Sequence, residues 1–146
     1  MTTRRLLLLG LVTGLALGSY IVASALTHAV GFPLDDAWIH QTYARNLGMY
    51  GEWSFYPGQP SAGSTAPLWS VLLAVGHILD LGPFIWTYLL GWVTLWALAV
   101  VGAYGFQWLV PGRREAALKN GKAIPAKPEW SFWAGALLAL EWHLVW

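Results

Sequence analysis

The stretch LLLLGLVTGLALGSYIVASALTHAV, residues 6–30, contains no formally charged residue. As a helix it would cover about 37 Å, enough to cross the roughly 30 Å hydrocarbon core of a bilayer with some tilt. Arg4 and Arg5 precede it, so the positive-inside rule predicts a cytoplasmic N-terminus. A cleaved signal peptide is the alternative, because ASA at 23–25 fits the cleavage pattern, although the apolar run exceeds the usual length of about 7–15 residues. Whether this segment is retained as a helix or cleaved as a signal peptide, we expect the residues that follow to lie outside the cytoplasm.

The composition also indicates a membrane protein. Of the 146 residues, 57% are hydrophobic and only 10% are charged, whereas a soluble domain has about 25% charged residues. The net charge of +1 gives no electrostatic reason to expect a nucleic-acid partner. The chain has no cysteine, which excludes disulfides and thiolate metal sites.

Three further apolar runs follow, at 67–81, 84–110 and 130–146. The run at 67–81 would cover only about 22 Å as a helix, and the run at 130–146 stops where the sequence stops. We therefore expect an all-α, polytopic membrane helix bundle with about four hydrophobic segments. Residues 1–146 would form a single membrane domain, the N-terminal part of a longer chain.

The polar loop at 111–129 raises a conflict about topology. It carries five basic and two acidic residues, and the positive-inside rule places such a loop in the cytoplasm. If 67–81 and 84–110 both cross the membrane, the loop lies outside instead. Either 67–81 does not fully span, or the rule fails here; the tight turn expected at DLGP slightly favours counting both crossings.

Residues 31–66 form the longest polar stretch, and its first part is predicted to be a short helix near 36–47. Asp35 is a good N-cap, and Asp36 would lie in the first turn, where the helix dipole favours an anion. Gly48 is a plausible residue to terminate the helix.

The predicted helix is amphipathic. Ile39, Tyr43 and Leu47 recur every four residues on one face, whereas Gln41 and Arg45 fall on the opposite face. Such a helix would lie flat at the membrane surface. The remainder of the stretch, beginning with GEWSFYPGQP, is predicted to be a turn-rich loop.

Asp35 and Asp36 are two of only seven acids in the chain. Helix capping accounts for at most one of them. A carboxylate at the outer membrane boundary would serve as a general base toward a lipid-borne substrate, or the pair would bind a divalent metal. Spacing alone does not choose between the two residues, because adjacent helical side chains point about 100° apart.

Four more residues each have a functional and a structural interpretation. Arg45 would clamp a substrate phosphate, or lie on a solvated face near lipid phosphates. His40 would bind substrate, or only form a hydrogen bond. Thr65, within SAGSTAPLW at 61–69, would help cradle a phosphate, or only precede a helix. Trp38 would stack on a sugar ring, or belong to the interfacial aromatic belt.

Taken in order, the elements of 35–69 resemble the first extracytoplasmic loop of polytopic glycosyltransferases with the C-type fold. The similarity is greatest to the bacterial branch of arabinofuranosyl- and mannosyltransferases. It rests on an ordered series of short motifs, namely Asp35-Asp36, Ile39, Tyr43-Ala44-Arg45-Asn46, Gly51 to Phe55, Pro57-Gly58 and Gly63 to Trp69.

The resemblance implies an integral enzyme of a bacterial-type plasma membrane that uses a polyprenyl-phosphate sugar as donor and a glycan, lipid or protein as acceptor. It implies that Asp35, or else Asp36, is the catalytic base or orients it, and that Arg45 is a candidate to contact the lipid phosphate. Motifs expected after the fourth apolar run are absent, so residues 1–146 alone would be inactive. The alternatives are part of a transporter or flippase, and a membrane scaffold without chemistry.

Overall fold

The computed structural model describes residues 2–32, 35–109 and 128–140. These residues are mostly helical. The elements, in chain order, are α1 (Thr3–Thr27), α2 (Asp35–Tyr50), β1 (Ser54–Tyr56), β2 (Gln59–Pro60), α3 (Pro67–Ile78), α4 (Gly82–Leu109) and α6 (Pro128–Leu140). They divide into two compact units, which we call the apolar unit (Met1–Ala23 with Gly91–Val145) and the loop unit (Ser24–Leu90).

Two of the helices, α1 and α4, are long and apolar enough to cross a membrane. In the most apolar 18-residue stretch of each helix, only 17% of the residues of α1 and 11% of those of α4 are buried. The core helix of a soluble protein would bury most of its surface. Two candidate spans support a membrane protein, but the predicted bundle of about four spans is not confirmed. The loop at 111–129 lies outside the described residues apart from its last two, and so does the end of the run at 130–146 beyond residue 140.

Helix α3 corresponds to the predicted short span at 67–81. It has 12 residues, so it is about 18 Å long and shorter than the roughly 30 Å hydrocarbon core. A left-handed turn follows it, in which Asp80 has φ 52° and Gly82 has φ 69°. The tight turn expected at DLGP is therefore present, and it joins α3 to α4.

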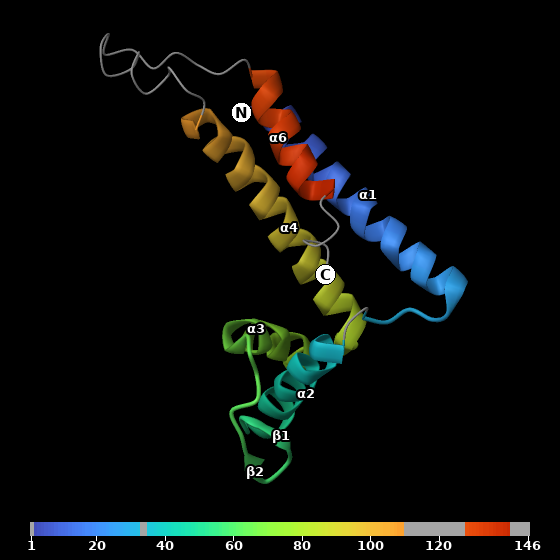
Figure 1. Ribbon diagram of the computed structural model, residues 1–146. Coiled ribbons are helices and arrows are strands. Elements are labelled where there is room, and N and C mark those ends of the chain that lie inside the picture. The colour runs from blue at the N-terminus through green and yellow to red at the C-terminus, as the bar shows by residue number, and fades with distance from the viewer. Residues whose placement is uncertain (1, 33–34, 110–127, 141–146) are drawn as a thin grey trace. The chain divides into compact units, whose positions relative to one another are not determined.

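Within the apolar unit, α1, α4 and α6 lie beside one another (Figure 1), and glycines lie at their contacts. The indole N–H groups of Trp92 and Trp96 donate to the carbonyl oxygens of Gly10 and Leu6, each at 3.0 Å. On α6, a Cβ added to Gly135 would lie 2.6 Å from the Ala99 carbonyl oxygen. Close helix approach through glycine is the usual way in which helices pack inside a membrane.

Within the loop unit, α2 and α3 lie side by side, and the hairpin β1–β2 lies against α2 (Figure 1). Ala44, Leu73 and Ala74 form the buried core between the two helices. Trp86, at the start of α4, covers Gly76 and donates its indole N–H to the Leu72 carbonyl oxygen at 2.8 Å.

The structure corrects the predicted boundaries and faces of the surface helix. Helix α2 runs through Gly48 to Tyr50, and Gly51, with φ 70°, is the residue that ends it. Gly48 is required for packing instead, because an added Cβ would lie 2.8 Å from the Ala74 carbonyl oxygen. Gln41 is buried at 5% exposure and not on a solvent face, because α3 and the start of α4 cover that side of α2.

The all-α prediction also missed a small antiparallel hairpin. Strands β1 and β2 pair Ser54 with Pro60 and Tyr56 with Gln59. Gly58 takes φ 77° in the turn, and its backbone N–H donates to the Glu52 carboxylate at 2.7 Å. The motif Pro57-Gly58 signalled this turn, but two such short strands have no readable alternation.

The glycine contact between α2 and α3 leads to a first prediction. Gly48→Ala should lower the free energy of unfolding by about 1–3 kcal/mol, because the new methyl group would overlap the backbone of α3. In a free helix the same change would stabilise by roughly 0.5–1 kcal/mol. The unfolding midpoint of the purified protein in detergent measures the effect. Gly91→Ala is the control, because its Cβ would meet nothing within 4 Å; equal stability of the two variants would contradict the packing argument.

Candidate functional site

Helix α2 presents three different faces in the loop unit. His40, Ala44 and Gly48 face α3. Ile39 and Tyr43 line a groove beside the hairpin. A third face carries exposed Trp38 and Arg45. Helical periodicity produces these faces because residues three or four apart lie above one another.

The acid pair lies at the start of α2. Asp35 and Asp36 are both exposed and occupy the first turn, where the helix dipole stabilises negative charge. The Asp35 carboxylate accepts the Asp36 backbone N–H at 3.0 Å. Among the described residues, neither carboxylate forms an ion pair, so both are open to a ligand.

His40, one turn after Asp36, is held by two serines. Its Nδ1 lies 3.1 Å from Ser64 Oγ and 3.2 Å from Ser70 Oγ, and the two hydroxyl groups lie 2.9 Å apart. His40 is 8% exposed. This cluster fastens the loop before α3 to α2, which gives His40 a structural function and leaves substrate binding by His40 a prediction.

Arg45 and Asn46 attach the hairpin to α2. The buried Asn46 amide donates to the carbonyl oxygens of Ser54 and Phe55 at 2.9 and 3.0 Å. Its Oδ1 accepts two hydrogen bonds of 3.2 Å from the Arg45 guanidinium.

Arg45 lies ten residues after Asp35, or about 15 Å further along the helix axis. That Arg45 binds a phosphate stays a prediction.

Trp38 belongs to an aromatic cluster at the start of α2 and α4. The centre of its ring lies 5.0 Å from the centre of the Phe32 ring and 5.9 Å from the centre of the Phe84 ring, and both pairs are edge-on. Phe84 also stacks on Tyr88, whose hydroxyl donates to the Gly31 carbonyl oxygen at 2.6 Å. Trp38 remains 46% exposed, so part of its ring is available to a ligand or to lipid headgroups.

Thr65 is exposed in the loop that precedes α3. The helix begins with Pro67 after Ala66, and no side-chain cap binds its first backbone N–H groups. Thr65 is therefore not a helix cap, and its contact with a phosphate stays a prediction.

A buried polar network, which the sequence did not reveal, joins α2, α3 and α4. The Gln41 amide nitrogen donates to Thr87 Oγ1 at 2.5 Å, and its Oε1 accepts a hydrogen bond from His77 Nε2 at 3.1 Å. This arrangement assigns the proton of neutral His77 to Nε2. Burial lowers the pKa of His77 below its ordinary value of 6.5, and the positive charge of Arg45 lowers it further.

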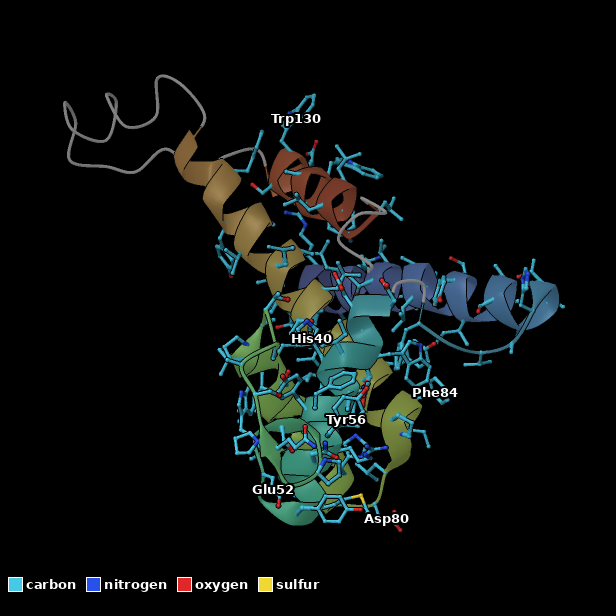
Figure 2. All side chains as sticks on the ribbon, turned by 60° about the horizontal axis from the view of Figure 1, so that its bottom comes forward. His40, Glu52, Tyr56, Asp80, Phe84 and Trp130 are labelled. Carbon is cyan, nitrogen blue, oxygen red and sulfur yellow. The ribbon has the colours of Figure 1, made fainter. Side chains whose placement is uncertain are left out.

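The groove beside the hairpin has a volume of about 420 Å³. Its walls come from α2, β1, β2 and the loop that follows, through Ile39, Tyr43, Phe55, Tyr56, Gln59, Pro60, Ser61 and Gly63. Figure 2 shows Tyr56, on the hairpin, beside α2. A volume of a few hundred Å³ is in the range of small-molecule sites.

Within residues 2–32, 35–109 and 128–140, no group of three His, Asp or Glu side chains is placed to hold a metal ion. A divalent ion at Asp35 and Asp36 would need further ligands from outside the described side chains. No protein family, curated protein or solved structure matches the chain. The candidate site therefore rests on its own geometry.

The lowered pKa of His77 predicts that acid weakens the loop unit. A histidine whose pKa is lower in the folded than in the unfolded state binds fewer protons when folded. The stability that neutral His77 contributes is complete above its ordinary pKa of 6.5 and is lost as the pH falls from 6.5 toward the lower folded value. Unfolding midpoints between pH 8 and pH 5 measure this loss.

His77→Gln removes the titrating group and keeps an N–H donor for Gln41, so it should flatten the pH dependence. Arg45→Gln should flatten it in part, because the Arg45 charge is the second cause of the lowered pKa. An unchanged pH dependence in His77→Gln would show that other groups cause the acid sensitivity.

Proposed function

We propose that the chain forms part of a membrane glycosyltransferase, which moves a sugar from a polyprenyl-phosphate donor to a glycan, lipid or protein acceptor. The observation that carries this proposal is the acid pair. Asp35 and Asp36 are exposed in the first turn of α2, at the edge of a folded polar unit that follows a candidate membrane span. The ordered motifs of 35–69 support it, because they form one unit in which α2, the hairpin and α3 contact one another.

The reaction requires a base beside the acceptor hydroxyl group, which attacks the anomeric carbon opposite the leaving phosphate. The acceptor hydroxyl oxygen attacks this carbon, the bond to the phosphate oxygen breaks, and the hydroxyl proton passes to a carboxylate. Attack from the side opposite the leaving group inverts the configuration, as in inverting glycosidases. The leaving polyprenyl phosphate is already anionic, so it needs a cation and not a proton donor.

We assign the proton transfer to Asp35, with Asp36 as the alternative. Both carboxylates are open to a substrate, and neither is committed to an ion pair among the described residues. If a divalent cofactor takes part, the same pair would supply two of its ligands and the metal would offset the phosphate charge.

We also propose an orientation in the plasma membrane. Arg4 and Arg5 precede α1, and the positive-inside rule then favours an N-terminus in the cytoplasm. In this orientation α1 and α4 supply the crossings and the chain between them stays outside; the 12-residue length of α3 supports this assignment. Residues 110–127 then return to the cytoplasm, where the positive-inside rule also places their basic residues.

The catalytic assignment predicts a large loss of rate when the base is removed. Asp35→Asn or Asp36→Asn should reduce sugar transfer by about 10²–10⁴-fold, which is the usual contribution of general base catalysis. The measurement uses membranes that contain the full coding product, with labelled polyprenyl-phosphate mannose or arabinofuranose as donor. Asp80→Asn is the matched control, because Asp80 is exposed in the same unit and asparagine tolerates its positive φ. Wild-type rates in both acid-pair variants would exclude the catalytic assignment and favour a scaffold.

The orientation predicts which residues are labelled from outside the cell. The chain has no cysteine, so single cysteines report their own side without further changes. In intact cells, Ala62→Cys should react with a membrane-impermeant maleimide, whereas Thr2→Cys and Lys119→Cys should react only after permeabilisation. Labelling of Lys119→Cys in intact cells would show that α3 crosses the membrane.

A further inference from the structure

We propose that the groove beside the hairpin binds a neutral saccharide ring, and that this ring belongs to the acceptor. The role as acceptor site rests on the proposed function, whereas binding of the saccharide does not.

The groove walls combine aromatic rings with neutral polar groups. Tyr43, Phe55 and Tyr56 supply the rings, and Gln59 and Ser61 supply an amide and a hydroxyl group. None of the residues that line the groove carries a charge. A sugar ring has an apolar C–H face and a rim of hydroxyl groups, so it matches walls that are mostly apolar with a few polar groups. A phosphate would find no cation there.

The floor of the groove is fixed by hydrogen bonds before any ligand arrives. The Tyr43 hydroxyl lies 2.7 Å from Ser61 Oγ and accepts the Gly63 backbone N–H at 2.7 Å. Ser61 Oγ also accepts the Phe55 backbone N–H at 3.1 Å. Gly63 allows this approach, because an added Cβ would lie 2.9 Å from the Tyr43 hydroxyl. A rigid site loses little conformational entropy when a ligand binds.

Two polar side chains on the groove remain free to bind a ligand. The Tyr56 hydroxyl and the Gln59 amide have no hydrogen-bond partner within the described ranges, and both side chains are exposed. Tyr56 itself is 65% exposed. The Gln59 amide can both donate and accept hydrogen bonds, and the Tyr56 hydroxyl can do either. Such groups suit the hydroxyl groups of a sugar.

The groove and the acid pair occupy one side of α2. Successive residues turn by about 100°, so Ile39 and Tyr43 point between the directions of Asp35 and Asp36. Ile39 lies about 6 Å along the helix axis from Asp35, and Tyr43 about 12 Å. One or two linked sugar rings in the groove would therefore reach from the hairpin toward the carboxylates, as an acceptor chain must.

Saturation-transfer NMR on the full chain in detergent tests the binding. The probes are methyl α-mannoside, methyl α-arabinofuranoside and their linear trisaccharides. We expect a trisaccharide to bind the wild type, and Tyr56→Ala to weaken it about tenfold through loss of the ring face. Gln59→Ala should weaken it as well. Tyr50→Ala is the matched control, because Tyr50 is 57% exposed in the same unit and does not line the groove.

Three outcomes would overturn the groove proposal. One is that no probe binds the wild type; another is that Tyr56→Ala and Gln59→Ala bind as the wild type does. The third is that Tyr50→Ala weakens binding as much as Tyr56→Ala, as expected if exposed tyrosines only anchor the loop at the bilayer surface. Unfolding midpoints equal to the wild type show that the variants are folded.

The transfer assay separates this proposal from the catalytic one. If Tyr56→Ala raises the KM for acceptor while the acid-pair variants lose kcat, both proposals stand. If trisaccharide binds through Tyr56 but Asp35→Asn and Asp36→Asn transfer sugar normally, the groove stands and the catalytic assignment fails. If the acid-pair variants are inactive and Tyr56→Ala leaves the KM for acceptor unchanged, the groove proposal fails alone.

Discussion

The close contact of α2 with α3 is the interaction on which the loop unit depends. It requires Gly48, because only a residue without Cβ lets the helix backbone approach the Ala74 carbonyl oxygen. A helix of 16 residues with as many polar side chains as α2 would be marginally stable alone in water. Packing on α3 therefore fixes α2, and α2 in turn fixes the acid pair at one end and the hairpin at the other.

Polar contacts then convert this packed pair into a rigid site. Asn46 satisfies two carbonyl oxygens of β1, and Gln41 links His77 to Thr87. Buried polar groups cost free energy unless each is paired. Because these groups are paired with one another across different elements, the relative placement of α2, the hairpin and α3 is specific as well as stable. A groove between them can thus keep its shape without a ligand.

The sequence predicted the parts of the fold that depend on local patterns. The apolar run at 6–30 became α1, and the acid pair did open a polar helix. The faces of that helix were predicted wrongly for Gln41, because periodicity shows which residues share a face but not which neighbour covers it. His77 and Ser70 were missed for the same reason: they join α2 only after the chain has turned back at the hairpin and entered α3.

The short apolar run at 67–81 shows why hydropathy alone left the topology open. Its composition resembles a span, yet α3 ends after 12 residues because Asp80 and Gly82 take left-handed conformations. Leu73 and Ala74 of α3 pack on Ala44 of α2, whereas Leu68 and Ile78 remain exposed. The length of α3 and its contact with α2 are the observations that bear on its topology, and neither can be read from mean hydropathy.

The arrangement of charges in the loop unit limits how the proposed reaction can be divided among its residues. Arg45 is the only Arg or Lys in residues 24–90, and it lies about 15 Å along α2 from Asp35, with its guanidinium bound to Asn46. A carboxylate is itself an anion, so neither Asp35 nor Asp36 can offset the charge of the leaving phosphate. If the phosphate lies beside the acid pair, its cation would be a metal bound by the pair or a residue outside the loop unit, and Arg45 would serve only a phosphate that lies further along α2. Under the proposed function, the loop unit would supply the acceptor side of the reaction, and a second, cationic wall near Asp35 and Asp36 would complete the donor side.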